Sequence, residues 1–353
     1  MSPHPAATSF DAQAQARLHG ALRFAAGVTA AFVGCEVLQL DPTFLAPVLA
    51  AALLANLPMR PPLKLGVVLV LAMAAAATFA FVSASLLRTT PLVLFLLLSL
   101  CMLLAFHAML GARSRLPFIL LLICLATIPV VVLVAPAQAG LFPRAMVRGI
   151  AIALVVTWAV YAIWPRVLPP SAPPAAPPLA ATPLALALMS TAVVVPLMLV
   201  LLLFGLTDIF PVMLGTVILV INFDLQRSRA QAVGLILGNV GGGLLGLLIH
   251  GVVLAMPNLV VLTLLLFAVL LGLGQRVAAG GNASAIAVVA CNAMLIILGS
   301  AIASGSGSLS LWMARLFQFA LAGAFAVGMM SLMWPMAVAR QPSPPAPPLP
   351  PLA

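Results

Sequence analysis

Hydrophobic residues occupy long blocks of this sequence, separated by short groups of proline, glycine and charged residues. Blocks such as Leu65–Leu87 and Leu116–Val134 reach or approach the ~20 residues that a helix needs to cross ~30 Å of hydrocarbon at ~1.5 Å per residue. Such blocks recur along nearly the whole chain. The pattern therefore predicts an all-α, polytopic integral membrane protein rather than a soluble domain with one anchor.

Breaks in the hydrophobic pattern predict six helical segments in each half of the chain. The first six are 20–39, 43–57, 65–87, 91–111, 116–135 and 145–164, and the second six are 184–206, 209–222, 231–255, 258–274, 283–303 and 311–335. The segments 43–57 and 209–222 are short for a membrane crossing, so we expect ten to twelve transmembrane helices.

Composition supports the membrane interpretation and argues against several functions. Of the 353 residues, 65% are hydrophobic and only 6% are charged, whereas soluble domains carry about 25% charged residues. The net charge is +10, but the basic residues are scattered without interleaved aromatic residues, which argues against nucleic-acid binding. The four cysteines lie inside apolar blocks without CxxC spacing, so we expect no disulfide framework, no metal site and no cofactor.

A proline-rich stretch divides the chain into two transmembrane regions. The predicted organisation is a polar tail at 1–16, a first transmembrane repeat at 17–165, a linker at 166–183, a second repeat at 184–336 and a proline-rich tail at 337–353. Runs this rich in proline cannot remain helical and form extended linkers.

Landmarks recur in the same order in the two halves, at intervals of about 163 to 170 residues. Asp208 in the second half corresponds to Asp41 in the first half. A second basic loop corresponds to the loop that contains Arg60 and Lys64. Further pairs are Arg113 with Arg276, Arg148 with Arg315, and Trp164-Pro165 with Trp334-Pro335. Six crossings per half predict parallel repeats, related by an axis along the membrane normal.

The distribution of basic residues predicts the orientation. With the N-terminus in the cytoplasm, 11 of the 15 Lys and Arg residues fall in cytoplasmic tails and loops, which leaves Arg88, Arg144, Arg148 and Arg315 outside. Because cytoplasmic loops carry an excess of basic residues, we expect a multi-pass protein of a bacterial-type inner membrane with both termini in the cytoplasm.

The chain resembles, over most of both membrane halves, the fusaric-acid-resistance and aromatic acid exporter superfamily. The resemblance rests on Leu22–Ala31 (LRFAAGVTAA), on Phe44–Ala55 with its internal proline, and on the basic loop that follows. It implies two six-helix halves and export of small aromatic or anionic compounds. Only the proline-rich linker stands where many members carry a large cytoplasmic domain. The chain therefore resembles a compact branch that works with periplasmic adaptor proteins.

Four of the five acidic residues lie in or beside predicted membrane segments: Glu36, Asp41, Asp208 and Asp224. Carboxylates at membrane depth are costly and mark functional sites. Glu36 is the best candidate for proton coupling, with a position at the outer interface as the alternative. Asp41 and Asp208 each precede a short segment, which favours helix capping over gating. Asp224 beside Arg227 indicates a salt bridge.

Basic residues near the outer helix ends are candidates for binding an anion. Arg144, Arg148 and Arg315 could hold a carboxylate through two hydrogen bonds, although arginines at such depths also reach the interface without binding a ligand. The interfacial position is the favoured interpretation, with anion binding as the alternative.

Glycine and proline mark helix packing and helix breaks. Gly234, Gly238, Gly242 and Gly246 form three consecutive GxxxG steps, which predict the close approach of another helix. Pro47 and Pro211 fit the short, broken segments that often form transporter sites.

These features favour a secondary transporter, most simply an exporter, that moves a small-molecule substrate across the lipid bilayer. A non-transporting scaffold of an efflux system is the alternative. The absence of a nucleotide-binding motif or a clustered metal or catalytic motif argues against an ATP-driven pump and an enzyme. The sequence leaves open whether the chain forms a homo-oligomer.

Overall fold

The computed structural model describes residues 5–57, 59–112, 115–136, 139–167, 182–203, 212–213, 216–217, 220, 229–303 and 309–339. These residues form helices and no strands. The helices are α1 (Pro5–Val37), α2 (Leu45–Asn56), α3 (Leu63–Leu86), α4 (Pro91–Gly111), α5 (Leu116–Val134), α6 (Leu141–Ile163), α7 (Pro183–Leu203), α9 (Arg229–Ala255), α10 (Leu259–Ala279), α11 (Gly281–Ala303) and α12 (Leu309–Ala339).

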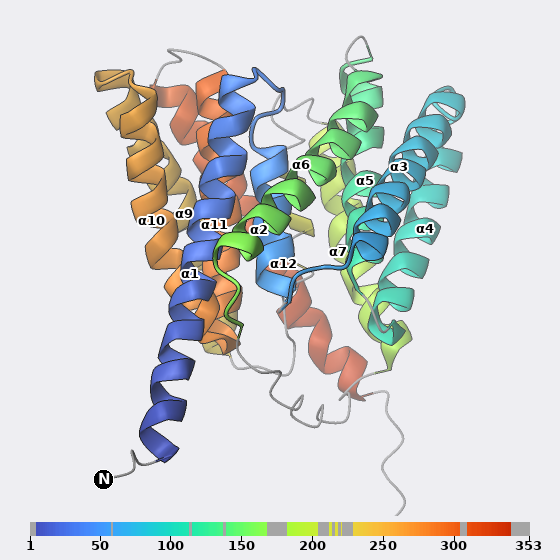
Figure 1. The fold of residues 1–353 in the computed structure, drawn as a ribbon. Coiled ribbons are helices and arrows are strands. Elements are labelled where there is room, and N and C mark those ends of the chain that lie inside the picture. The colour runs from blue at the N-terminus through green and yellow to red at the C-terminus, as the bar shows by residue number, and fades with distance from the viewer. Residues whose placement is uncertain are drawn as a thin grey trace, which may run out of the picture.

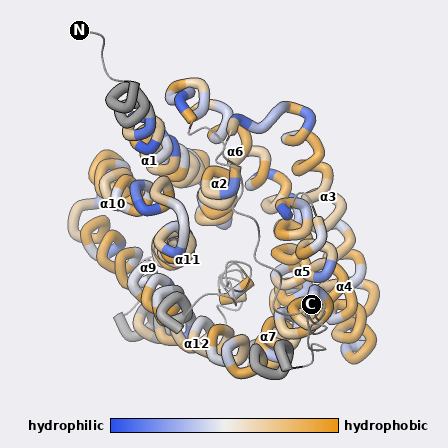
Figure 2. The backbone as a smooth tube through the Cα atoms, turned by 90° about the horizontal axis from the view of Figure 1, so that it is seen from below, coloured by the Kyte–Doolittle hydropathy of each residue, from blue (hydrophilic) through white to orange (hydrophobic). Residues whose placement is uncertain are grey.

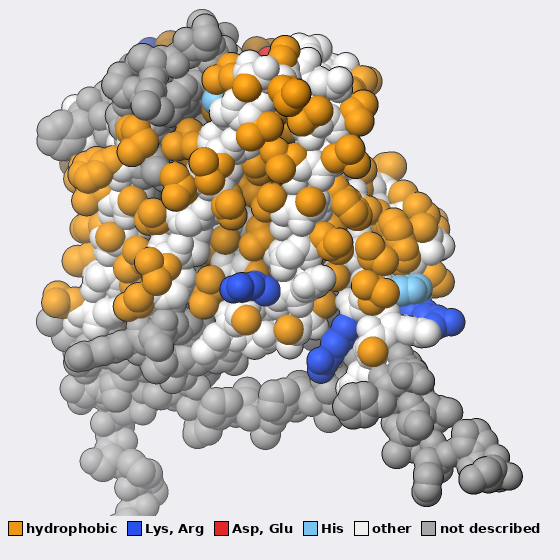
Figure 3. All heavy atoms as spheres, turned by 90° about the vertical axis from the view of Figure 1, so that its left-hand side faces the viewer, with side chains coloured by type: hydrophobic (Ala, Val, Ile, Leu, Met, Phe, Trp, Pro, Cys, Tyr) orange, Lys and Arg blue, Asp and Glu red, His pale blue; other side chains and the backbone are white. Residues whose placement is uncertain are grey.

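Nine of the described helices are long and apolar enough to cross a membrane. Leu45–Asn56 in α2 and Ala320–Met333 in α12 are shorter apolar stretches. Large hydrophobic side chains such as Leu71, Leu92, Leu237 and Leu264 are exposed on the outside of the bundle, which is the arrangement that a lipid solvent favours. The side face in Figure 3 is mostly hydrophobic, with Lys and Arg side chains along its lower edge. The protein is a polytopic helical membrane protein.

The helix boundaries differ from the sequence prediction mainly at the N-terminus. Helix α1 begins at Pro5, so most of the predicted tail 1–16 is helical. Its alanine and glutamine residues are good helix formers, and their polarity does not prevent a helix from extending beyond the membrane. At the other end, α12 continues to Ala339 and includes the first residues of the predicted tail 337–353. The predicted segment 209–222 lies largely outside the described residues.

The chain ends of the bundle lie on one side. Helix α1 begins, α7 begins and α12 ends at the lower side of the molecule in Figure 1, and the chain runs toward that side after α6. Seen from that side, α1, α9, α10 and α11 are grouped together, and α3, α4 and α5 form a second group (Figure 2).

Helices at matching positions in the two predicted repeats make similar contacts. Helix α3 packs on α5 and α6, and α9 packs on α11 and α12. Helix α1 contacts α6 as α7 contacts α12. The first helix of each half also packs against the fourth helix of the other half, α1 on α10 and α7 on α4.

The burial patterns of α3 and α9 coincide at an offset of 166 residues. Met73, Ala76, Ala77, Ala80, Ser83 and Ala84 are buried in α3, and the buried residues at the same offset in α9 are Asn239, Gly242, Gly243, Gly246, Ile249 and His250. Both helices therefore turn a face of mainly small residues inward, toward the fifth helix of their own half.

Candidate functional site

Helix α2 is a short, buried helix at the centre of the first half. Its 12 residues extend about 18 Å at ~1.5 Å per residue, which is less than the ~30 Å of hydrocarbon. Residues 45–51 and Leu53 are buried, because α2 packs against α1, α6 and α11. A largely buried helix that is too short to span the hydrocarbon would leave chain ends near membrane depth, where polar groups become costly.

The connection between α1 and α2 brings together the residues that we name the α1–α2 junction: Glu36, Asp41, Thr43 and Arg148. Arg148 Nη2, from α6, donates a hydrogen bond to the Asp41 carbonyl oxygen at 2.6 Å. Thr43 faces the Glu36 carboxylate. Close packing holds this connection, since a Cβ at Gly299 of α11 would lie 2.9 Å from Phe44 Cβ and 3.1 Å from Thr43 Oγ1.

Two polar atoms of this junction are buried without a partner among the described residues. Glu36 Oε1 and Thr43 Oγ1 are both enclosed and make no hydrogen bond. Glu36 is thus turned partly inward rather than placed freely at the interface. Unpaired buried oxygens cost about 1–3 kcal/mol each, and functional groups commonly explain such atoms.

The capping role predicted for Asp41 is wrong. The N-cap of α2 is Phe44, and no side chain accepts a hydrogen bond there. The Leu45 N–H instead bonds to the Pro42 carbonyl at 3.1 Å, so the backbone of the preceding turn satisfies the start of the helix. The exposed Asp41 contributes its backbone carbonyl to Arg148.

A second polar group surrounds the other end of α2, and we name it the Arg23 cluster: Arg23, Trp158, Tyr161 and Trp164. The Tyr161 hydroxyl donates to the Leu57 carbonyl at 2.6 Å, and Trp158 Nε1 donates to the Pro61 carbonyl at 2.8 Å. The Arg23 guanidinium lies over the Tyr161 ring at 4.6 Å. These contacts fix the C-terminal end of α2 to α6 and α1.

Sequence reasoning treated Arg23 only as a topology marker and missed this cluster. Two signals could have found it. Arg23 interrupts the apolar pattern of the first segment, and Tyr161 is the single tyrosine of the chain. An arginine within a membrane segment is a functional candidate by default.

The remaining predicted site residues are not brought together by the described structure. Arg144 is exposed on α6, one turn before Arg148. Asp208, Asp224 and Pro211 lie outside the described residues, as does the side chain of Arg315. Pro47 is buried in the first turn of α2, where a proline lacks no needed N–H. It therefore accompanies a helix start and does not kink the helix.

The glycine motif serves helix packing, as predicted. A Cβ at Gly238 would lie 3.0 Å from the Ile286 carbonyl, and one at Gly246 would lie 2.7 Å from the Met294 carbonyl. Gly234 and Gly242 face Ile286 and Ala290 in the same way. All four glycines of the motif thus allow α9 to approach α11 closely.

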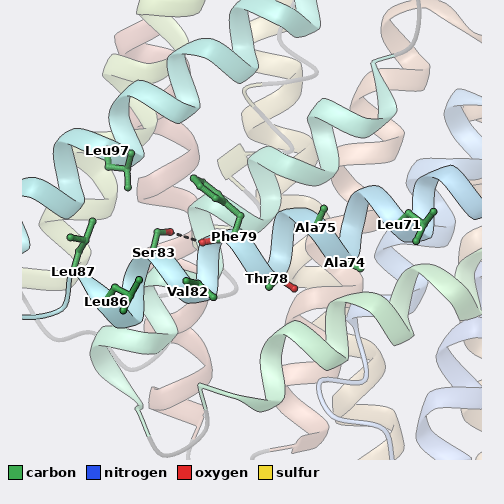
Figure 4. Close-up of a pocket in the computed structure, with 10 residues that line it drawn as sticks. All are labelled: Leu71, Ala74, Ala75, Thr78, Phe79, Val82, Ser83, Leu86, Leu87 and Leu97. Carbon is green, nitrogen blue, oxygen red and sulfur yellow. Dashed lines mark hydrogen bonds between the residues drawn. The ribbon is translucent and has the colours of Figure 1, made fainter.

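An apolar groove of about 860 Å³ follows α3 beside α4 (Figure 4). Thr78 and Ser83 are the polar residues among those that line it, and Ser83 Oγ donates to the Phe79 carbonyl of its own helix at 2.6 Å. A similar groove of about 830 Å³ lies on α9 and α10, over glycines of α9. The first groove has only these two hydroxyl groups, so it fits a lipid chain better than a polar ligand. The second groove also includes Gln275 and Arg276 among its lining residues. Within the described chain, no group of three His, Cys, Asp or Glu residues could hold a metal ion.

Comparison with known proteins gives one similarity. Residues 20–161 match the model of a family described as a protein of unknown function (DUF2955). No curated protein and no solved structure matches the chain. The match runs from the middle of α1 to Tyr161 near the end of α6, so it contains the α1–α2 junction and all of the Arg23 cluster except Trp164.

Proposed function

We propose that this chain is an inner-membrane secondary transporter that exports small aromatic or anionic compounds. One observation carries the proposal: α2 is enclosed by α1, α6 and α11, is too short to span the membrane, and has charged groups at both ends. Short, interrupted helices with polar ends at membrane depth are the elements from which many transporter sites are built.

The two halves are proposed to be parallel repeats that move against each other around this region. The corresponding packing of α3 on α5 and of α9 on α11 supports this arrangement, as do the crossed contacts of α1 with α10 and of α7 with α4. Substrate would pass where the halves meet, and Glu36 would carry the coupling proton. Resemblance to the aromatic acid exporters supports the substrate class and a periplasmic adaptor as partner.

A set of acidic variants tests the transport proposal. In a strain that lacks the gene, the chain should restore resistance to aromatic acids, and Glu36→Gln should reduce resistance to the level of the deletion strain. Asp41→Asn should keep resistance, because its backbone carbonyl makes the contact with Arg148. Membrane levels of each variant serve as the control for insertion.

The same experiment separates transport from a scaffold role. Unchanged resistance in Glu36→Gln, together with lost resistance on removal of the proline-rich tail 340–353, would favour a non-transporting assembly component. A wild-type chain that confers no resistance to any aromatic or anionic compound would refute export of this class.

A further inference from the structure

Arg23 is a buried cation without a carboxylate partner in the described part of the chain. Its side chain is 6% exposed, in the segment Gln13–Val37 that is apolar enough to span. Nη1 donates to the carbonyl oxygens of Trp164 and Arg166, at 2.7 Å each. Tyr161 provides the aromatic face. The carbonyls and the ring reduce the cost of burying the charge, but they do not neutralise it.

The rest of the guanidinium faces a cavity. A space of about 140 Å³ lies between α1, α2, α6 and α10, lined by Gly20, Arg23, Leu54, Tyr161 and Ala278 among others. Arg23 Nη2, which donates to neither carbonyl, lies 3.8 Å from the place that a Cβ at Gly20 would occupy. The absence of a side chain at Gly20 thus leaves room beside Arg23 Nη2.

The surroundings of this cavity favour an anion with an apolar body. Exposed Arg17, Arg166 and Arg276 lie next in sequence to residues that line it, and such a ring of positive charge attracts anions. The other walls are apolar and include Phe24. A volume near 150 Å³ is known to hold a benzene ring.

The proposed repeat places an apolar residue of the second half at the position of Arg23. Under the proposed repeat, α7, α4 and α12 correspond to α1, α10 and α6. At that junction, Leu186 and Met189 pack against Leu110, Ala185 and Met333. Met189 follows Arg23 by 166 residues, the offset that aligns α3 with α9. Under this correspondence, apolar side chains occupy the junction of α7, α4 and α12, and Met189 stands where the first half has Arg23.

We infer that the Arg23 cavity binds the carboxylate of a small aromatic anion of about the size of benzoate. The carboxylate pairs with Arg23 Nη2, and the ring lies against the apolar walls. The cavity lies toward the end of the bundle where α1 begins, which is the predicted cytoplasmic side, and it would load substrate for export. The inference rests on the proposed function and assigns that function a binding site.

Binding to the purified full-length chain in uncharged detergent tests this site, with tryptophan fluorescence as the signal because Trp158 and Trp164 lie in the cluster. Benzoate should give a saturable change, and the neutral analogue benzamide should not. Arg23→Gln should weaken benzoate binding by about ten-fold or more, as expected when a charge-assisted hydrogen bond is lost.

A pair of glycine variants tests the binding site without removing the charge of Arg23. Gly20→Val fills the space beside Nη2 while retaining Arg23, and it should weaken benzoate binding. Gly34→Val is the control on the same helix, because a Cβ at Gly34 would meet no atom within 4 Å. If Arg23→Gln fails to elute as a folded protein, the comparison of these two variants decides the question.

Three results would overturn the site: equal binding of benzoate and benzamide, unchanged benzoate affinity in Gly20→Val, or unchanged affinity in folded Arg23→Gln. Displacement of benzoate by inorganic phosphate or by phosphatidylglycerol at lower concentration would also overturn it, because the cavity would then hold a phosphate group. Benzoate binding without any export phenotype would refute the transport proposal and leave the site intact. Export with no benzoate binding would refute the site alone.

Discussion

Single residues acquire different roles according to which atoms the fold presents. Asp41 contributes a backbone oxygen, whereas Glu36 contributes a carboxylate oxygen that is buried and unpartnered among the described residues. The two acids are five positions apart, yet of the two only Glu36 has a buried carboxylate oxygen without a hydrogen-bond partner among the described residues. Their chemistry therefore follows from the path of the connection between α1 and α2.

Arg148 and Arg144 offer a matched comparison on one helix. Arg148→Ala removes the 2.6 Å hydrogen bond to the Asp41 carbonyl and should reduce the free energy of unfolding by up to about 1 kcal/mol. Arg144→Ala removes the same charge from an exposed position and should change it by less than about 0.5 kcal/mol. Thermal unfolding in detergent measures both, and equal losses would show that the Asp41 contact does not hold the junction.

At the scale of helices, the close approach of α9 to α11 depends on glycines. The α9–α11 pair places the Ala290 carbonyl where a Cβ at Gly242 would lie. Only a residue without a side chain fits there, whereas the neighbouring Gly241 faces open space.

Alanine at Gly242 and alanine at Gly241 should affect the stability of the protein differently. Gly242→Ala should destabilise the protein by about 1–3 kcal/mol, because α11 must move away from α9. Gly241→Ala should be neutral, since a Cβ there would meet no atom within 4 Å. Melting temperature and the yield of folded protein report the effect. Similar melting of the two variants would contradict the observed packing of α9 on α11.

The whole molecule presents hydrophobic side chains to lipid and gathers its chain ends on one side. The start of α1 and the end of α12 lie toward the same side of the molecule, and the chain runs toward that side after α6 (Figure 1). Lys and Arg side chains follow the lower edge of the side face in Figure 3. This distribution supports the proposed orientation, because basic residues favour the cytoplasmic side.

Reporter fusions test that orientation. A fluorescent protein that folds only in the cytoplasm should be active when fused after Ala353 or inserted within 170–178. A phosphatase that folds only in the periplasm should be active when inserted in the loop 87–90, between α3 and α4. Reversed activities would invert the orientation and would place the Arg23 cavity on the outer side of the membrane.

The sequence by itself determined the membrane class, most helix boundaries and the glycine-mediated packing of α9. These properties depend on the number of consecutive apolar residues and on small residues spaced four apart, both of which are local quantities. The prediction that residues 1–16 form a polar tail was wrong for most of these residues. Their high helix propensity extends α1 back to Pro5.

Tertiary structure alone decided which polar groups meet. Arg23 and Tyr161 are 138 positions apart, and Asp41 and Arg148 are 107 apart, so no local pattern relates them. The enclosure of α2 by α1, α6 and α11 also follows only from long-range packing, because an apolar helix has the same composition whether lipid or protein surrounds it. Contact between distant segments therefore selected the Arg23 cavity, which the order of residues did not reveal.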